Sequence, residues 1–425
     1  MQQRTRREFV RDGLSAVAMG WAAPGFLSEL ARAQTSHSRN LVVLYLGGGN
    51  DALSFLVPYT DPAYYDRRPT LAIPADQVID IGTDSTGHPL GLHPELTGFK
   101  TMFDDGALAL LQRTGYPDSS RSHFRGTDVF STADPDRPQG RGWLGHYLDT
   151  LPGPVDALTA WNTQQQLPRS LLANLVGVPS IPNLSTYAFS SPNSAFSLEE
   201  AAHSRMTAKR IVALGATSAR NTHVAFVNST VQAAFDTLDR VGVVAAHVPT
   251  TEYPQTALGG ALRAVGSAVA SGSGTKLYWV QTGGYDTHAQ QDTLTGNYAR
   301  LMRTLNGGVS AFYADLKNQR LLEQTVVLVF SEFGRRVSEN GSNGTDHGSG
   351  GLMFAFGGRV RGGIYGRTAS LEQRPDNPDL EYGGRDVRFE TDFRAVYARI
   401  IDHWLGVDSL QILGADFRHT GVEFI

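Results

Sequence analysis

Three short apolar runs, each rich in β-branched residues and each ending in a polar, glycine-rich turn, constrain the fold of this chain most strongly. The runs cover residues 41–46, 277–281 and 325–330. Apolar stretches of this length that end at glycine-rich turns predict buried β-strands. A shorter run at residues 108–111 predicts a fourth strand, and residues 352–356 predict a fifth.

Two amphipathic helices are predicted from apolar side chains that recur every three or four residues. One helix directly precedes the strand at residues 325–330, and the other lies near the end of the chain. Strand, helix and strand in this order predict an α/β fold with a mostly parallel central sheet. The apolar positions are Leu294, Tyr298, Leu301, Leu305, Val309, Phe312 and Leu316 in the first helix, and Phe393, Val396, Tyr397, Ile400, Ile401 and Trp404 in the second.

Acidic, serine or histidine residues follow the predicted strands at their carboxyl ends. In open parallel sheets, ligands bind in the crevice beyond that edge, so we expect a functional site there. Residues 151–272 lack such clusters and contain proline-, serine- and alanine-rich stretches with polar helical patterns. We interpret this segment as an inserted, largely helical cap that faces the substrate.

Five residues near the predicted strand ends are candidate metal ligands: Asp51, Asp286, His288, Glu332 and His347. Asp286 and His288 lie two residues apart on one loop, where both could face one ion. Their oxygen and nitrogen donors suit zinc or manganese. Glu332 ends an otherwise apolar strand, where a carboxylate is costly unless it is paired or metal-bound. The alternatives are a helix cap for Asp51, a hydrogen-bonded turn for Asp286 and His288, a salt bridge to Arg335 or Arg336 for Glu332, and a surface position for His347.

Ser122 and His123 follow the fourth predicted strand, in a segment that could begin a helix. A helix N-terminus favours an anionic intermediate, so Ser122 is a candidate nucleophile with His123 beside it. Arg121 and Arg125 flank this pair and could hold an oxyanion by bidentate contacts.

Other interpretations of this segment stay open. Ser119, Ser120 and Ser122 could compete for the position that caps the helix, and Ser119 and Ser120 are rival nucleophiles. His93 could support a metal ligand or could be an ordinary loop histidine.

The chain has no cysteine. Disulfides, thiolate zinc sites and thiol catalysis are therefore excluded, as are a lipoprotein anchor and sulfatase chemistry that starts from an oxidised cysteine. Any metal must bind through His, Asp and Glu. The formal net charge is −4, and a mildly acidic chain gives no reason to expect nucleic acid or an anionic membrane as a partner.

Residues 1–33 have the layout of an export signal. The sequence TRREFVR at 5–11 is followed by an uncharged apolar stretch at 13–27 and by a small-x-small cleavage site at 31–33. This order predicts a twin-arginine signal peptide and a periplasmic or secreted location. An amphipathic N-terminal helix is the alternative. No other run reaches the roughly 18 apolar residues of a membrane span, so none is expected after processing.

These elements, in this order, resemble the domain of unknown function 1501 family of the alkaline-phosphatase-like, or sulfatase-like, superfamily. The resemblance rests on the leader and on five motifs: LGGGND at 46–51, RSHF at 121–124, GYDTH at 284–288, SEFGR at 331–335 and DHG at 346–348. It implies an alkaline-phosphatase-like three-layer sandwich over residues 34–425, with the predicted cap inserted in it.

In that superfamily, two metal ions at the strand ends flank a hydroxyl nucleophile. Superfamily members usually show Asp-His where this chain shows Glu332-Phe333. The ion that Glu332 would hold has therefore lost a nitrogen ligand. His123 or Asn50 could replace that ligand, or the site could hold one ion. By position, the resemblance implies that Asp286, His288 and His347 hold one ion, that Asp51 and Glu332 hold the other, and that Ser122 is the nucleophile.

The first hypothesis for function is an exported metal-dependent hydrolase of phosphate or sulfate esters, with one or two zinc or manganese ions. Its partners would be a small-molecule or polymer ester and the twin-arginine export machinery. The alternative is a catalytically weakened relative that acts as a binding or assembly factor at the cell envelope, which Phe333 favours. A third hypothesis is an enzyme that modifies a sugar or polysaccharide without a covalent intermediate.

Overall fold

The computed structural model describes residues 39–153, 155–187, 198–218, 222–418 and 422–425, so the predicted signal peptide lies outside the described residues. One central sheet, with strand order β10-β5-β9-β8-β1-β7-β6 and with β13 beside β5, organises the fold. Its strands are β1 (Asn40–Leu46), β5 (Leu108–Gly115), β6 (Ala160–Asn162), β7 (Leu277–Thr282), β8 (Thr325–Phe330), β9 (Gly351–Gly357), β10 (Gly363–Tyr365) and β13 (Thr391–Asp392).

Most neighbouring strands of this sheet run parallel. β1 pairs in parallel with β7 and β8, β6 pairs with β7, and both β10 and β13 pair with β5. Within the described sheet, β9 alone runs antiparallel, against β5 and β8. All five predicted strands lie in this sheet, and the predicted α/β fold with a mostly parallel sheet is confirmed.

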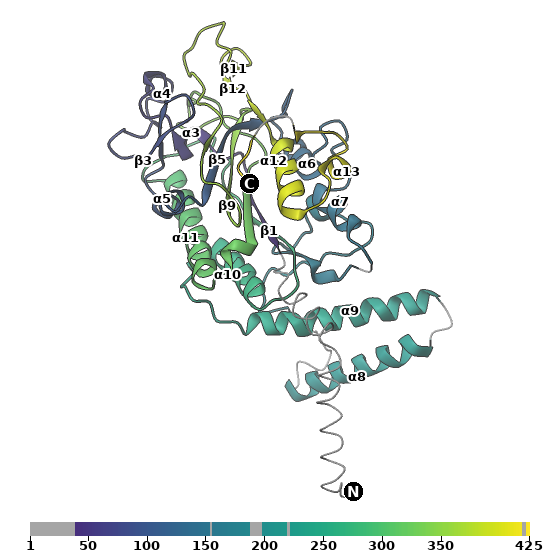
Figure 1. The fold of residues 1–425 in the computed structure, drawn as a ribbon. Helices are drawn as coiled ribbons and strands as arrows, with labels where there is room; N and C mark the ends of the chain where they lie inside the picture. The colour runs from purple at the N-terminus through teal and green to yellow at the C-terminus, as the bar shows by residue number, and fades with distance from the viewer. Residues whose placement is uncertain (1–38, 154, 188–197, 219–221, 419–421) are drawn as a thin grey trace, which may run out of the picture. The chain divides into compact units, whose positions relative to one another are not determined.

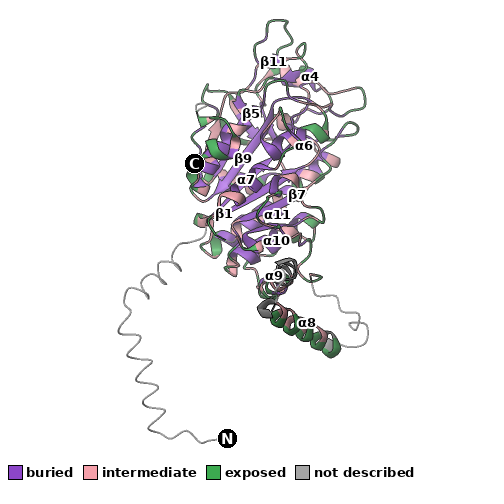
Figure 2. Ribbon diagram, turned by 90° about the vertical axis from the view of Figure 1, so that its right-hand side faces the viewer, coloured by how far each residue is buried: buried purple, intermediate pink, exposed green. Residues whose placement is uncertain are grey.

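Alternate side chains of the central strands enter two separate hydrophobic cores, one on each face of the sheet. In β1, Val42 and Leu44 belong to one core, and Leu41 and Val43 to the other. Because helices cover both faces, the strands read as continuous apolar runs, and Figure 2 shows the buried residues concentrated there. The helices are α5 (Thr97–Asp104), α10 (Ala257–Ala270) and α11 (Asn297–Asn318) on the first face, and α6 (His123–Thr132), α7 (Trp143–Thr150) and α12 (Phe393–Arg399) on the second (Figure 1).

The structure divides the segment 151–272 that the sequence predicts as a cap. β6 extends the central sheet, and α10 packs on that sheet as part of the sandwich. α8 (Leu198–Ser218) and α9 (Thr222–Ala245) pack against each other, and α9 also contacts α10. The segment is largely helical, but its two ends belong to the main fold.

Smaller elements complete the described chain. β2, β4 and β3 form a separate antiparallel sheet, and β11 pairs with β12. The second predicted helix begins as α12 and continues as the π-helical turn η4. None of the described helices combines the length and apolar character that a membrane crossing requires. The remaining bounds are α3 (Ala52–Phe55), β2 (Leu56–Val57), α4 (Pro62–Arg67), β3 (Ile79–Thr83), β4 (Pro89–Leu92), η1 (Ala157–Thr159), η2 (Arg169–Leu171), η3 (Leu322–Gln324), β11 (Leu380–Glu381), β12 (Asp386–Val387), η4 (Ile400–Leu405) and α13 (Ser409–Leu413).

His93 is a structural histidine in the loop after β4. Its side chain is fully buried, its Nε2 lies 2.5 Å from the carbonyl oxygen of Thr293, and its Nδ1 accepts a hydrogen bond from the Glu95 N–H at 3.1 Å. Burial lowers the pKa of His93 from 6.5 to about 4. The ring therefore joins two loops in its neutral form.

Acid is expected to destabilise the fold through His93. The unfolded chain takes up a proton near pH 6.5 while the folded chain resists it until about pH 4, so the free energy of unfolding falls across this window by up to about 3 kcal/mol. Urea unfolding of the chelator-treated wild type and of His93→Gln between pH 7 and pH 4 measures the difference. Parallel pH profiles for the two proteins would contradict this assignment.

Candidate metal centre

The sheet topology explains how residues from distant parts of the chain meet at one edge. The loops that follow β1, β7 and β8 leave the sheet at its carboxyl edge, as the sequence predicts. His347 precedes β9, and in an all-parallel sheet it would lie at the opposite edge. Because β9 runs antiparallel to β8, its first residues lie beside the end of β8, and His347 joins the loops from the other strands.

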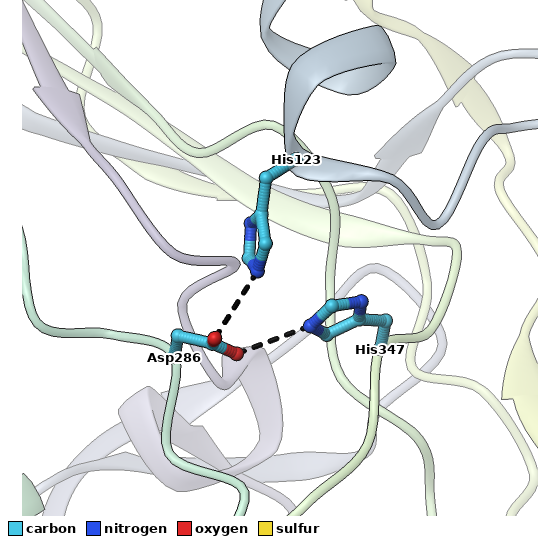
Figure 3. A group of neighbouring side chains, drawn as sticks. All are labelled: His123, Asp286 and His347. Carbon is cyan, nitrogen blue, oxygen red and sulfur yellow. Dashed lines mark hydrogen bonds and ion pairs between the residues drawn. The ribbon is translucent and has the colours of Figure 1, made fainter.

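Three histidines surround the carboxylate of Asp286 (Figure 3 shows two of them). The Nε2 atom of His123 lies 3.3 Å from Asp286 Oδ2, and the Nε2 atom of His347 lies 3.1 Å from Asp286 Oδ1. The Nε2 atom of His288 lies 3.2 Å from Asp286 Oδ1 and 2.8 Å from His347 Nε2. The ligand atoms of His123, Asp286 and His347 lie within 4.8 Å of one another. We call these four residues the metal cluster, because they form a candidate site for a metal ion.

The other ring nitrogen of each histidine faces an oxygen that can only accept a hydrogen bond. His123 Nδ1 lies 2.6 Å from Glu332 Oε1, and His288 Nδ1 lies 3.2 Å from Asp346 Oδ1. His347 Nδ1 lies 2.7 Å from the carbonyl oxygen of Arg121.

These contacts favour, in each neutral ring, the tautomer that carries its proton on Nδ1 and leaves the lone pair on Nε2. Metal-binding histidines have the same arrangement, because the outer acceptor fixes both the tautomer and the ring orientation.

In this tautomer, the Nε2 atoms face one another and the carboxylate of Asp286, none of which can donate a hydrogen bond. His123 Nε2 is buried without a hydrogen bond among the described residues, and the Nε2 atoms of His288 and His347 lie 2.8 Å apart, where rings protonated on Nδ1 have no proton to donate. Burial lowers the pKa of His347 below its ordinary value of 6.5, which keeps that ring neutral at neutral pH. A divalent cation between the four ligand atoms would satisfy the lone pairs. Three nitrogen donors and one carboxylate fit zinc or manganese.

Arg335 holds the carboxylate of Asp286 in place. Its buried guanidinium donates to Asp286 Oδ1 at 2.6 Å and to the carbonyl oxygens of Gly48, Gly49, Tyr285 and Thr345, so it joins three loops. Burial by itself would raise the pKa of Asp286, but the hydrogen bond of Arg335, the contact with His347 and the charge of Arg335 outweigh it and lower the pKa to about 2. Asp286 is therefore a carboxylate at every physiological pH.

Glu332 positions His123. It is buried, it accepts a hydrogen bond from the Gly48 N–H at 2.9 Å, and its Oε1 contacts His123. The salt bridges that the sequence allows for Glu332 do not form: Arg335 pairs with Asp286, and Arg336 pairs with Asp346. Glu332, a predicted metal ligand, is thus brought to the site, but it contacts His123 and does not face the other ligand atoms.

Phe333 forms the wall on which two histidine rings rest. Its ring centroid lies 4.9 Å from that of His123 and 4.8 Å from that of His347. Gly49, with φ +69°, lies against this ring, and a Cβ atom there would come within 2.3 Å of it. The glycine-rich turn after β1 is therefore required for close packing against Phe333.

Asp51 is not brought to the metal cluster. Its carboxylate is buried and accepts hydrogen bonds from Arg68 at 2.7 and 3.0 Å, from Ser54 at 2.6 Å and from Gln291 at 2.7 Å. Burial by itself would raise the pKa of Asp51, but the charge of Arg68 outweighs it and the pKa falls. Both oxygens are thus already engaged within the protein.

Ser122 and Arg121 lie beside the cluster without contacting its ligand atoms. Ser122 is the exposed N-cap residue of α6, and its hydroxyl makes no hydrogen bond among the described residues. Arg121 pairs with Asp386 at 2.6 Å, and its guanidinium lies 3.5 Å from the centroid of the Tyr382 ring. Its contribution to the cluster is the carbonyl oxygen that holds His347.

The other residues weighed from the sequence have local roles. Ser120 Oγ accepts a hydrogen bond from the Ser122 N–H, and Arg125 donates to the carbonyl oxygen of Pro135. Ser119 buries its hydroxyl without a partner among the described residues. Asp346 and Arg335, which position ligands, are not among the site residues that the sequence predicts. The signals that could have found them are the position of Asp346 directly beside His347 and that of Arg335 within the SEFGR motif.

Residues 107–413 match the family model described as "Protein of unknown function (DUF1501)". The chain belongs to the DUF1501 family. This match includes every residue of the metal cluster. No curated protein matches the sequence.

Solved structures resemble this DUF1501 chain at low identity. They include the PsFucS1 sulfatase from Pseudoalteromonas sp. (13% identity, 80% of this chain and 67% of that chain, TM-score 0.33) and the C-terminal periplasmic domain of EcEptC from Escherichia coli in complex with Zn (10%, 76% and 73%, 0.35). Alkaline phosphatase from the Antarctic bacterium TAB5 also matches (10%, 77% and 95%, 0.30). At these TM-scores, the likenesses do not fix the chemistry of the metal cluster.

Proposed function

We propose that the chain is an exported metal-dependent hydrolase of phosphate or sulfate esters, holding one zinc or manganese ion between His123, Asp286, His288 and His347. One observation carries the proposal: three imidazoles place Nδ1 beside fixed acceptor oxygens while their Nε2 atoms converge on one carboxylate. Such an ion would act as a Lewis acid that stabilises negative charge on an ester and makes water a better nucleophile.

The protein's own groups would prepare the site for this ion. Glu332 and Asp346 hold protons on the Nδ1 atoms of their histidines, and the Arg121 carbonyl does the same for His347. Arg335 keeps Asp286 ionised and aimed at the rings. Preorganisation of this kind lowers the cost of assembling the ligands around the cation.

The arrangement favours one ion rather than two. Both oxygens of Asp51 are engaged by Arg68, Ser54 and Gln291, and Glu332 is engaged by Gly48 and His123. Among the described residues, one group of His, Asp and Glu side chains has its ligand atoms within range of a common ion.

Ser122 is the nucleophile that the sequence predicts, and its hydroxyl, at the start of α6, makes no hydrogen bond among the described residues. If it attacks the ester, Ser122→Ala should lower kcat on an aryl phosphate or an aryl sulfate by at least ~10³-fold while the metal content stays unchanged. Chelation should abolish wild-type turnover, and zinc or manganese should restore it. Full activity of Ser122→Ala would assign the attack to water. Chelation-resistant turnover would contradict the metal-dependent hydrolase.

A binding or assembly role at the cell envelope is the second candidate. Phe333 favours it, because this ring occupies the position where the superfamily usually offers a histidine and packs on His123 and His347 instead. Such a protein would hold the ion tightly and turn over neither ester. Either candidate is proposed to act after export by the twin-arginine route.

A further inference from the structure

Two hollows near the metal cluster share part of their lining. The first, of about 580 Å³, is bounded at one end by His123, Asp286 and Glu332. The second has a volume of about 880 Å³. Gln166 and Gln281 line both hollows, so the hollows are neighbours, and we call the two together the groove. Either hollow alone has the size of a small-ligand site, and the two together offer room for a longer molecule.

Neutral hydrogen-bonding side chains dominate the second hollow. A side-chain amide both donates and accepts hydrogen bonds, as a hydroxyl group does. The exposed side chains of Gln165, Gln166 and Gln281 make no hydrogen bond among the described residues. No Asp or Glu is among the described residues that line this hollow, and Arg263 is the one Lys or Arg. Its five amide residues are Gln164, Gln165, Gln166, Asn183 and Gln281.

Two residues that line the groove each have a buried nitrogen that makes no hydrogen bond among the described residues. His247 lines the second hollow and Trp279 the first, and His247 Nε2 and Trp279 Nε1 are both buried without a hydrogen bond in the described structure. Buried polar atoms are normally hydrogen-bonded, so these two nitrogens keep unused hydrogen-bonding capacity beside the groove. At the rim of the first hollow, the Phe124 side chain is 88% exposed directly after His123, and its ring face offers apolar contact to a sugar ring.

The groove does not suit an extended peptide or a polyanion. A peptide would add to a free strand edge, but the outer edge of β6 is already occupied, because Asn162 exchanges backbone hydrogen bonds with Pro179 and Ile181. A nucleic acid would need a row of cations. Arg169 in the first hollow is paired with Asp128 at 2.8 Å, and Arg263 stands alone among the cations in the second.

We infer that this groove binds a predominantly neutral oligosaccharide chain and presents an ester group on one of its sugar units to the metal cluster. The inference rests on the proposed function and narrows its substrate class to an esterified polysaccharide. Sugar hydroxyls would meet the free amides of Gln166 and Gln281, and the sugar ring nearest the cluster would meet Phe124. The second hollow would hold the units further along the chain.

Gly260 provides a sharp test, because it lies on α10 in the lining of the second hollow and a Cβ atom there would meet nothing within 4 Å. Gly260→Tyr should therefore fold and obstruct the far part of the groove, while Gly260→Ala is the matched control. The zinc-loaded full chain is first screened on an array of plant, algal and bacterial glycans. The best-bound glycan is then titrated calorimetrically as fragments of one to six sugar units.

We expect wild-type affinity to rise at least ~10-fold from two to six units, which is about 1.4 kcal/mol. Gly260→Tyr should remove this gain with chain length, and Gly260→Ala should retain it. Gln166→Ala/Gln281→Ala should weaken hexasaccharide binding ~10-fold, whereas Gln373→Ala, at an exposed position outside the groove, should not. Thermal unfolding of each variant verifies its fold.

Failure of every glycan to bind, or binding of a random peptide library in preference to glycans, would overturn the inference. An affinity that Gly260→Tyr leaves unchanged would also overturn it. Two readouts separate it from the proposed function. Glycan binding by a chain that holds no zinc and cleaves no ester would retain the groove and reject the hydrolase. Turnover of small aryl esters without any glycan binding would retain the hydrolase and reject the groove.

Discussion

Replacing Asp51 with alanine is expected to cost about 3–5 kcal/mol of unfolding free energy and to leave the metal content of the folded protein unchanged. Arg68 and Asp51 form an ion pair in which both side chains are almost fully buried. Loss of the carboxylate would leave the Arg68 guanidinium buried with the carbonyl oxygens of Val337 and Arg336 as its main acceptors. An uncompensated buried charge is among the largest penalties that one substitution produces.

Urea unfolding measures the loss of unfolding free energy, and elemental analysis of the same samples measures the metal content. Asp66→Ala is the matched control, because Asp66 is exposed in the same region, and it should change stability by less than about 0.5 kcal/mol. Asp51→Leu/Arg68→Met removes both charges and should recover part of the loss. A stable Asp51→Ala protein that has lost its ion would instead make Asp51 a ligand, as the sequence predicts.

The sequence predicts the central sheet and its helices well because buried strands and amphipathic helices leave local patterns of apolar residues. Strands covered on both faces must be apolar throughout, so β1, β7 and β8 stand out as runs, and α11 stands out by its one-sided apolar spacing. The same patterns place polar residues at strand ends. They do not fix strand direction: the antiparallel course of β9, which brings His347 to the cluster, depends on pairing with β5 and β8.

Local patterns also do not show which partner each carboxylate takes. Asp51, Asp286 and Glu332 all follow strands and look alike in the sequence. In the folded chain, Arg68 engages the first, His123 and Gly48 engage the third, and the second faces three imidazoles. Residues elsewhere in the chain decide these roles, since Arg68 pairs with Asp51 and Arg335 pairs with Asp286.

Substitution of one cluster histidine should remove most of the metal. Four-ligand zinc sites bind with roughly 10–16 kcal/mol, so an equal share per ligand is about 3 kcal/mol, or ~10²–10³-fold in affinity. We expect wild type to hold about one ion per chain, and His288→Ala or His347→Ala to lose it on dialysis. His88→Ala, at an exposed loop position, should retain it. Glu332→Gln, which weakens the acceptor behind His123, should lose ~10–100-fold in affinity.

Competition with a fluorescent zinc chelator measures these affinities, and thermal unfolding measures their consequence for stability. At an ion concentration 100 times Kd, the bound ion should stabilise wild type by about 2.7 kcal/mol, and His347→Ala should show little of this gain. The discriminating result is a zinc affinity that falls moderately in Glu332→Gln and further in His288→Ala and His347→Ala. A structural cluster of hydrogen-bonded histidines would instead make the stability of all three variants fall without any dependence on added zinc. Equal zinc affinity in wild type and His347→Ala would remove the metal centre from this fold.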